Sequence, residues 1–378
     1  MAESPEQATP RQLESYMEER LPVIEQRLER YVKILTSDEL LDKLKTVGGY
    51  PQNITREAID EPVKIAVLRT GGKRVRPFLV YLSHDLVRDG RKPYKFVDDL
   101  AAPMDLVHKG TCVIDDIEDK SEERNGLQTL HISHGRDVAI NVGNLLYFAY
   151  EYFFDYPELF LSNGNGTKIG KDKEHEIRKA VSQELRRAHY GQGVDIQWSK
   201  IKLKDLLAGD RQPSEENYSQ MARDKSTFPL ATRIGAILGG ANPQQKATLI
   251  KVGEYAGLAF QIKDDLLDLK PGTTNYGGDI QERKVTLPIV KVFARGDEHS
   301  NSLRNLLTSR MIPMLPWRNL IDEVVEIMNN CGAIQDSEKV AREYADKAIN
   351  LLREQFQKES KPRITLEELI DYGVTRTK

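Results

Sequence analysis

Apolar side chains recur at three- and four-residue steps along most of the chain. The first such stretch covers residues 12–36, and its apolar positions are Leu13, Met17, Leu21, Ile24, Leu28, Tyr31, Val32 and Leu35. This spacing places them on one face of a helix. Pro22 lies inside the stretch and predicts a kink or a restart, because proline removes a backbone donor.

The same spacing predicts further helices at about residues 55–68, 75–86, 103–119, 137–154, 173–197, 214–239, 243–269, 315–330 and 335–357. No apolar–polar alternation longer than four residues indicates a strand, and no short repeat is present. We therefore expect an all-α bundle forming a single domain over residues 1–378. Residues 1–10 are expected to be a disordered tail, residues 11–50 an N-terminal helical extension, and residues 162–166 a flexible surface loop.

Composition narrows the range of functions. The 378 residues carry a net charge of -3 with lysine and arginine scattered throughout, which argues against nucleic acid as a partner. Two cysteines, Cys112 and Cys331, are too few for a disulfide framework and favour a reduced, cytoplasmic location. The most apolar window, residues 145–154, is too short to span a bilayer and contains Glu151, so we expect no transmembrane segment.

Two acidic segments end apolar helices. Residues 115–119 read Asp-Asp-Ile-Glu-Asp, and residues 264–268 read Asp-Asp-Leu-Leu-Asp. Residues four apart share a helix face, so the first and last aspartate of each segment lie side by side and repel one another. One such segment alone is commonly a solvated helix face, but two copies favour a hard divalent cation, Mg²⁺ first. The candidate metal ligands are Asp115, Asp116, Asp119, Asp264, Asp265 and Asp268.

A basic turn supplies the opposite charge. Residues 72–77 read Gly-Lys-Arg-Val-Arg-Pro and place three cations within four positions. Arginine offers a bidentate fork to phosphate oxygens and lysine a point charge. The turn is not a nucleotide P-loop, because no Ser or Thr follows the lysine and no strand precedes it. Alone it would be an exposed basic loop; beside two acidic segments it suits a polyphosphate ligand.

Taken in order, these motifs resemble those of the trans-isoprenyl diphosphate synthases, the family of farnesyl and geranylgeranyl diphosphate synthases. The resemblance covers about residues 55–376. Its motifs lie at residues 72–77, 115–119, 131, 191–195, 225–227, 261–268 and 278–288.

The resemblance implies a helical bundle around a deep central cavity, with both acidic segments at its mouth, and a homodimer. Three Mg²⁺ ions would hold an allylic diphosphate between Asp115 and Asp119 on one side and Asp264 on the other. Further contacts to the allylic diphosphate are implied for Arg124, Lys225 and Lys284. The second substrate, isopentenyl diphosphate, would contact Lys73, Arg76 and His108. The path of the allylic cation would be lined by Gln192, Ser226 and Gln261. The implied catalytic residues are Asp115, Asp119, Asp264, Lys225 and Gln261.

Some of these residues also fit purely structural roles. His108 precedes Asp115 by seven residues, or two helical turns on the same face, which fits a site but also fits a packed core histidine. Gln192, Gln261 and Ser226 fit ordinary polar positions that cap or interrupt helices equally well.

One position departs from the family pattern. The family reads Arg-Arg-Gly after the first acidic segment, whereas this chain reads Arg124-Asn125-Gly126. Loss of a charged hydrogen bond to the second substrate costs about 1–3 kcal/mol. The consequence is weaker affinity, compensation by another residue, or loss of the elongation step.

Product length is expected to depend on residues near the first acidic segment. Gly110 and Thr111 lie roughly 6–8 Å upstream of the metals at about 1.5 Å per residue, and neither is bulky, which would let a growing tail pass. Residues 144–148 resemble the Asn-x-x-Tyr-Phe of geranylgeranyl synthases. We expect Tyr147 or Phe148 to close the cavity near the twenty-carbon length, unless both are ordinary core aromatics.

These observations predict a Mg²⁺-dependent prenyltransferase. It would condense isopentenyl diphosphate head-to-tail with an allylic diphosphate to give geranylgeranyl diphosphate or a longer all-trans product. One alternative is a class I terpene cyclase. Asn125 argues for this alternative, whereas the retained Lys73, Arg76 and His108 argue against it. The other is a non-catalytic subunit of a hetero-oligomer, which would be expected to lose an acidic segment.

Overall fold

A computed structural model of the chain describes residues 10–44, 52–68, 72–161, 169–201, 212–273, 276–308 and 317–377. Residues 1–9 of the tail expected at residues 1–10, and the loop expected at residues 162–166, lie outside the described residues. In the described part of the chain, no helix is both long enough and apolar enough to cross a membrane.

Helices make up almost all of the described structure, which confirms the all-α prediction. In chain order the elements are α1 (Arg11–Leu35), α2 (Asp38–Leu44), α3 (Gln52–Thr55), a π-helical turn η1 (Arg56–Asp60), α4 (Glu61–Leu68), α5 (Val75–Arg88), α6 (Val97–Asp119), β1 (Glu123–Arg124), β2 (Leu127–Gln128), α7 (Leu130–Ser133), α8 (Arg136–Tyr147), α9 (Ala149–Asp155), α10 (Pro157–Phe160), α11 (Lys171–Lys200), α13 (Glu215–Lys225), α14 (Phe228–Gly239), α15 (Pro243–Asp268), α16 (Gly278–Gln281), α17 (Leu287–Arg295), α18 (Glu298–Thr308), α19 (Trp317–Asn330), α20 (Ala333–Gln355) and α21 (Lys361–Thr375).

Prolines act differently at different places in these helices. Pro22 and Pro103 lie inside α1 and α6, and both helices continue through them. The first helix therefore does not restart at Pro22, and the helix expected from residue 103 already begins at Val97. Where one helix was expected over residues 214–239, α13 ends at Lys225 and α14 begins at Phe228. Pro229 lies in the first turn of α14, where proline is accepted because its missing N–H would have no helical partner. The chain therefore turns at this point and begins a new helix.

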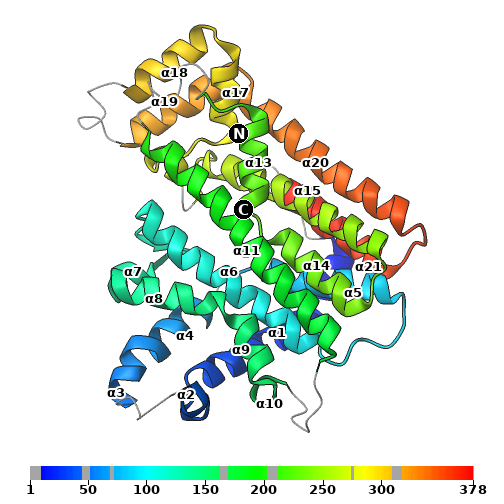
Figure 1. Cartoon of the computed structure of the whole chain (residues 1–378). Coiled ribbons are helices and arrows are strands. Elements are labelled where there is room, and N and C mark those ends of the chain that lie inside the picture. The colour runs from blue at the N-terminus through cyan, green and yellow to red at the C-terminus, as the bar shows by residue number, and fades with distance from the viewer. Residues whose placement is uncertain are drawn as a thin grey trace.

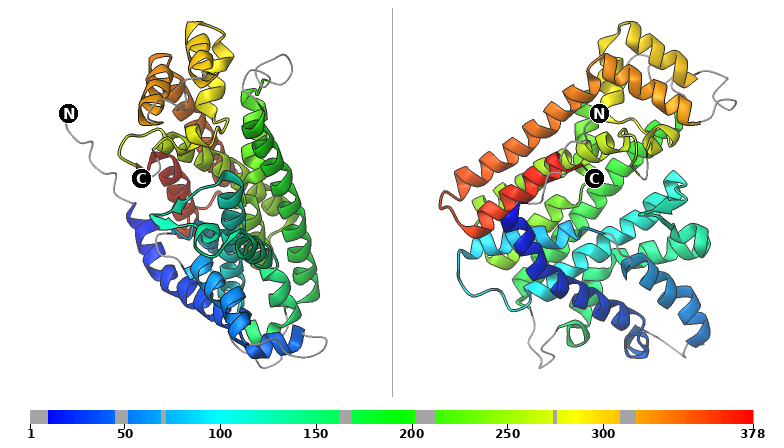
Figure 2. Two further views of the ribbon diagram at one scale, coloured as in Figure 1. Left: turned by 90° about the vertical axis from the view of Figure 1, so that its left-hand side faces the viewer. Right: turned by 180° about the vertical axis from the view of Figure 1, so that it is seen from behind.

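The long helices pack side by side in pairs. Figure 1 shows α6 beside α8, α5 beside α14 and α15 beside α20, with α11 running across the front. The view from behind places α1 along the opposite side, where it contacts α6 and α21 (Figure 2). Helices α17 to α19 gather at one end of the molecule, around an apolar cluster of their own. The ends of α6 and α15 that carry the acidic segments are positioned by this framework.

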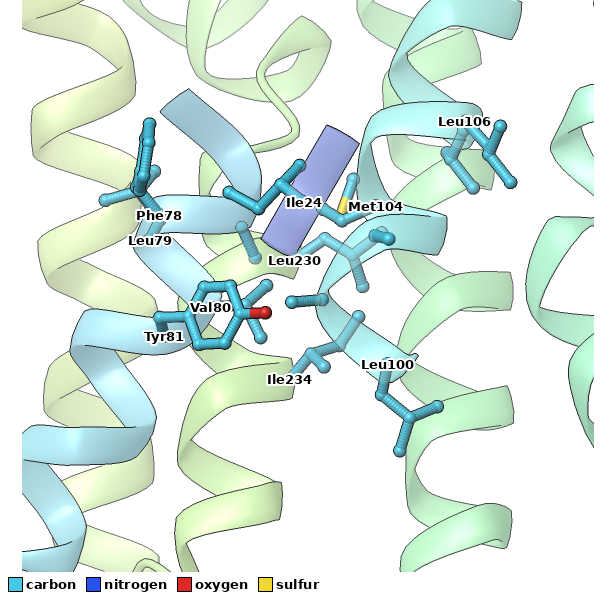
Figure 3. Packing of buried hydrophobic residues seen from close by; sticks show 14 of the residues in the cluster. Ile24, Phe78, Leu79, Val80, Tyr81, Leu100, Met104, Leu106, Leu230 and Ile234 are labelled. Carbon is cyan, nitrogen blue, oxygen red and sulfur yellow. The ribbon is translucent and has the colours of Figure 1, made fainter. Parts of the chain in front are cut away.

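The main apolar core lies where α1, α5, α6 and α14 meet. Ile24 from α1, Phe78 from α5, Met104 from α6 and Ile234 from α14 converge there (Figure 3). All four side chains are fully buried. Burying a side chain of this size contributes about 1.5–3 kcal/mol, so these contacts hold the basic turn and the first acidic helix in a fixed relation.

Candidate active site

The first acidic segment lies at the end of α6, where three elements meet. Asp116 is buried, and Asp115 and Asp119 are half-buried. Arg124 from the β1–β2 hairpin donates from Nε to Asp116 Oδ1 at 2.7 Å, and its Nη2 lies 3.4 Å from Asp115 Oδ2. Gln192 on α11 donates to Asp115 Oδ1 at 3.1 Å. The predicted Arg124 and Gln192 therefore both contact the first segment.

The second acidic segment, at the end of α15, is held by three different partners. Asp264 pairs with Arg376 near the C-terminus, with the guanidinium Nη2 2.5 Å from Oδ1. Asp265 accepts a 2.6 Å hydrogen bond from the hydroxyl of Tyr218 and a 2.9 Å bond from the amide of Gln261. Gln261, predicted to line the cation path, thus contacts a predicted metal ligand.

Asp268 binds the chain that follows it. Its two carboxylate oxygens accept the backbone N–H groups of Gly278 and Asp279, each at 3.1 Å. These bonds fold the loop after α15 back onto the helix and bring the carboxylate of Asp279 beside that of Asp268.

Lys284 connects the two acidic segments. Its Nζ lies 2.6 Å from Asp119 Oδ2 at the end of α6 and 3.8 Å from Asp279 Oδ1 in the loop held by Asp268. A third carboxylate, from Glu282, lies 2.8 Å from the same ammonium. The two segments lie nearly 150 residues apart in sequence. The first segment and the loop held by the second therefore meet at a single cation.

The carboxylates here differ from isolated ones in their affinity for protons. Burial, together with the charge of Asp115, raises the pKa of Asp119 to about 6, although Lys284 opposes the shift. Burial and the neighbouring Asp279 raise the pKa of Asp268 to about 7. Burial raises the pKa of Asp279 itself to about 8 against the opposing charge of Lys284. These groups hold protons more tightly than usual because the lysine does not fully offset burial and mutual repulsion.

Asp115 is shifted in the opposite direction. Burial would raise its pKa, but the charges of Lys225, Lys284 and Arg124 outweigh burial and hold the pKa below its ordinary value. Lys225 also pairs with Asp195 on α11. All three cations predicted to contact an allylic diphosphate therefore converge on Asp115.

The donor set fits a hard divalent cation. It consists of carboxylate oxygens, which Mg²⁺ prefers, and the raised pKa values of Asp119 and Asp268 reflect negative charge that an added cation would stabilise. Within the described ranges, no three His, Cys, Asp or Glu side chains are grouped so that they could hold a metal ion. The aspartates instead pair with basic side chains, and a metal would have to compete with Arg124, Lys284 and Arg376 for them.

The basic turn divides its cations between two tasks. Arg74 is only 4% exposed and binds Asp105 on α6 at 2.5 Å and Glu25 on α1 at 2.8 Å, so its charge is used to hold the turn against both helices. Arg76 donates to Thr227 Oγ1 at 2.7 Å, and burial lowers its pKa. The Nζ of Lys73 lies 5.5 Å from the ring centroid of Tyr372. Of the cations in the turn, Arg76 is held by no carboxylate within ion-pair distance among the described residues.

Comparison with known proteins decides the family. A sequence model of the polyprenyl synthetase family matches residues 56–313. The chain belongs to the polyprenyl synthetase family. The match confirms the predicted family, its all-helical fold and its prenyltransferase class.

Individual relatives agree with this family. The short chain isoprenyl diphosphate synthase of Methanothermobacter thermautotrophicus is 29% identical over 355 residues, covering 89% of this chain and 99% of that protein. The octaprenyl diphosphate synthase of Escherichia coli is 29% identical over 294 residues, covering 76% and 81%. The solved structure of geranylgeranyl pyrophosphate synthetase from Pyrococcus horikoshii superposes with a TM-score of 0.75 at 24% identity, covering 96% of this chain and 98% of that chain.

Asn125, the departure from the family pattern, has a clear local reason in this polyprenyl synthetase. Arg124 pairs with Leu127 across the β1–β2 hairpin, which leaves Asn125 and Gly126 as a two-residue loop. Their φ angles are 54° and 74°. Loops of this length in the type I′ form need positive φ at both positions and favour Asn-Gly. Asn125 suits the turn that presents Arg124 to Asp116, but it brings no charge.

The structure changes the interpretation of Gly110. A Cβ atom at Gly110 would lie 2.7 Å from the carbonyl oxygen of Gly143 and 3.0 Å from Leu146 Cβ on α8. The missing side chain thus lets α6 and α8 approach closely and does not leave open space, contrary to the expectation. Thr111 is half-buried, and its hydroxyl donates to the carbonyl of His108 at 2.7 Å.

Tyr147 and Phe148 differ in their surroundings. The ring of Tyr147 lies against Gly110, at 3.3 Å from where a Cβ would stand, and makes an edge contact with His189. Phe148, at the break between α8 and α9, is 56% exposed. Only Tyr147 is therefore placed beside the helix that carries the first acidic segment.

The remaining predicted side chains, His108 and Ser226, lie on different elements. His108 on α6 is half-buried, and burial with the neighbouring charges of Arg76 and Lys109 holds its pKa well below the usual value. Ser226, at the end of α13, packs against Gly257 of α15, where a Cβ would lie 2.2 Å from its Oγ. The structure thus gives Ser226 a packing contact between two helices.

Sequence reasoning missed four contributors as individual residues: Asp195, Tyr218, Asp279 and Arg376. Asp195 and Asp279 belong to motifs that were used for the family resemblance, so a signal for them existed. Arg376 belongs to the basic C-terminal end, which also resembles that of the family, so a signal for it existed as well. Tyr218 carried none, because a tyrosine gains a role only when folding brings it to Asp265.

Proposed function

We propose that this polyprenyl synthetase condenses isopentenyl diphosphate with an allylic diphosphate to give geranylgeranyl diphosphate or a longer all-trans prenyl diphosphate. The observation that carries the proposal is Lys284 between Asp119 and Asp279, since this cation joins the first acidic segment to the loop that Asp268 of the second segment binds. Such a centre suits a polyphosphate with divalent cations and is of little use to a neutral substrate.

The residues divide into three groups by role. Mg²⁺ would be held by Asp115, Asp116, Asp119, Asp264, Asp265 and Asp268, in a number we propose to be three ions. The allylic diphosphate would contact Arg124, Lys225 and Lys284. The second diphosphate would contact Lys73, Arg76 and His108.

The chemistry proposed is cleavage of the allylic C–O bond. When bound, Mg²⁺ would stabilise the negative charge that develops on the departing diphosphate. Lys225, Lys284 and Arg124 are already oriented toward the same carboxylates and would add fixed positive charge where this negative charge appears. Gln261 and Gln192, each bonded to an aspartate, would keep the acidic side chains in position. The double bond of isopentenyl diphosphate would then attack the allylic cation to form the new C–C bond, and the proton released would pass to the departed diphosphate.

Product length stays a proposal. The relatives named above make short chain and octaprenyl products, so relationship alone does not choose a length. We propose that Tyr147 limits the tail near twenty carbons, because its half-buried ring lies against α6 one turn before the first acidic segment.

Assembly and location are part of the same proposal. Tyr190 and Val194, four residues apart on α11, are 79% and 41% exposed, and Phe148 and Ile140 of the α8 region are also exposed. Apolar side chains left in water at this density favour a partner, and we propose a second copy of the chain. Light scattering at micromolar concentration tests this, and a monomer would contradict it. A cytoplasmic location rests on the two unpaired cysteines, Cys112 and Cys331.

One incubation tests the activity. The purified chain is mixed with Mg²⁺ and allylic diphosphates of five, ten and fifteen carbons, with and without isopentenyl diphosphate. Longer diphosphates that form only when isopentenyl diphosphate is present would support the proposal. Cyclic hydrocarbon formed without it would instead favour a terpene cyclase, and no product under either condition would favour a non-catalytic subunit.

A further inference from the structure

One face of α6 carries a lysine between two aspartates. Asp105, Lys109, Cys112 and Asp116 follow one another at steps of four, three and four residues, which places them along one side of the helix. Asp105 is paired with Arg74 at 2.5 Å, and Asp116 is paired with Arg124 at 2.7 Å. Lys109 lies between these two pairs, and it makes no ion pair with any of the described residues.

The ammonium of Lys109 reaches the basic turn. Its Nζ lies 3.4 Å from the position that a Cβ on Gly72 would occupy, next to the guanidinium of Arg74, whose Nη1 is 3.7 Å from the same point. Any side chain at residue 72 would therefore meet the lysine. The absence of a side chain at Gly72 lets the ammonium lie beside the backbone of the turn, immediately before Lys73.

Lys109 lies among basic side chains and among carboxylates that are already paired. Burial lowers its pKa most, Asp105 and Cys112 oppose this shift, and the charges of Arg74 and Arg124 add to it. The adjacent His108 is affected in the same way by Arg76 and Lys109. Five basic groups from three elements thus surround a region whose nearby carboxylates are already paired. A region of this kind favours an anion.

We propose that Lys109 binds the diphosphate of isopentenyl diphosphate and supplies the positive charge that Asn125 does not. The inference rests on the proposed function. It resolves the three consequences of Asn125 in favour of compensation: the hairpin keeps the Asn-Gly loop that its geometry needs, and the lost charge comes from α6. Lys109 reaches the site from the basic turn, on the side of the predicted second-substrate residues Lys73, Arg76 and His108.

Steady-state kinetics of four proteins test the role of Lys109. The wild type, Lys109→Met, Lys109→Arg and the control Lys92→Met are compared, the control removing an exposed lysine that precedes α6. The KM for isopentenyl diphosphate is measured at saturating allylic substrate, and the KM for the allylic substrate at saturating isopentenyl diphosphate. Thermal unfolding of each variant confirms that it is folded, and Lys109→Gln replaces the methionine variant if that one is not.

Loss of a charged contact is expected to raise the KM for isopentenyl diphosphate about ten-fold or more in Lys109→Met. The KM for the allylic substrate should stay within about two-fold, Lys109→Arg should retain most of the affinity, and Lys92→Met should match the wild type. An active wild type whose KM for isopentenyl diphosphate is unchanged in Lys109→Met, or rises equally for both substrates, would overturn the role of Lys109 alone. A wild type that makes no elongated product would contradict the proposed function itself.

Discussion

The ammonium of Lys284 lies 2.6 Å from a carboxylate oxygen of Asp119, the last residue of α6. The same ammonium also approaches Asp279, whose backbone is bound by Asp268 at the end of α15. A single side chain therefore connects the two acidic segments. Because of this arrangement, we expect a substitution in one acidic segment to affect the other segment as well.

Removing this connection should reduce activity strongly. Lys284→Gln keeps the length of the side chain but removes its charge, and a charged hydrogen bond that is worth about 1.5–3 kcal/mol corresponds to a loss of about ten- to a hundred-fold in kcat/KM for the allylic substrate. Lys291→Gln is the matched control, because Lys291 pairs with the exposed Glu215 away from both segments. Equal activities in the two variants would contradict the role of Lys284.

The raised pKa values predict how metal and pH act together on stability. Asp119, Asp268 and Asp279 have pKa values of about 6, 7 and 8 in the folded protein, well above about 4 for an unfolded aspartate. Their contribution to stability is therefore fully present below about pH 4 and is lost as the pH rises through about 6–8.

Mg²⁺ should restore the stability that is lost, because it binds the deprotonated carboxylates of the folded state. We expect 5 mM MgCl₂, taken as roughly a saturating amount, to raise the Tm more at pH 8 than at pH 5.5. Sodium chloride of the same ionic strength controls for screening. An equal Tm shift at both pH values, or an equal effect of the sodium salt, would rule out this linkage.

Gly110 and Gly193 should respond oppositely to alanine. A Cβ at Gly110 would be 2.7 Å from the carbonyl oxygen of Gly143, so Gly110→Ala is expected to push α6 and α8 apart and lower the free energy of unfolding by about 1–3 kcal/mol. Gly193 lies inside α11, and nothing lies within 4 Å of a new Cβ there. Gly193→Ala should therefore raise the free energy of unfolding by about 0.5–1 kcal/mol. Urea unfolding measures both, and effects of the same sign would show that the close approach of the helices is not what Gly110 provides.

Product length should depend on Tyr147 and not on Phe148. Tyr147 is half-buried beside Gly110, so Tyr147→Ala removes a large side chain near α6 and is expected to shift the product toward longer chains. Phe148 is more than half exposed, and Phe148→Ala is the control that removes a similar aromatic ring at the neighbouring position. Chromatography of the dephosphorylated products measures the distribution. Unchanged products in both variants would end the proposal for Tyr147.

Part of this site could be predicted from the sequence because it depends on local spacing. The four-residue steps within each acidic segment place two aspartates on one helix face, whatever the helix packs against. The order of charges in the basic turn is equally local. The position of Lys284 is different, since it depends on how α6, α15 and the loop held by Asp268 meet, which no spacing within one helix determines.

The effects of individual glycines and prolines on the fold also depend on packing that the sequence does not show. The sequence indicated that Gly110 is small, but only the position of α8 shows that the space is filled by the backbone of Gly143. Likewise Pro22 was expected to break a helix that tertiary packing keeps continuous, whereas Pro229 lies in the first turn of a new one. The tendency of proline to interrupt a helix is outweighed by tertiary packing where a helix buries an apolar face, as α1 does.

The central claim is that both acidic segments hold one metal-bound diphosphate, and calorimetric titration with inorganic pyrophosphate tests it most directly. The wild type, Asp119→Asn, Asp264→Asn and the double variant are titrated with and without Mg²⁺. We predict binding that requires Mg²⁺, is weakened about ten-fold or more by either single substitution, and is weakened little further in the double variant, because the two residues act as one unit. Binding without Mg²⁺, or losses that simply multiply in the double variant, would contradict the account.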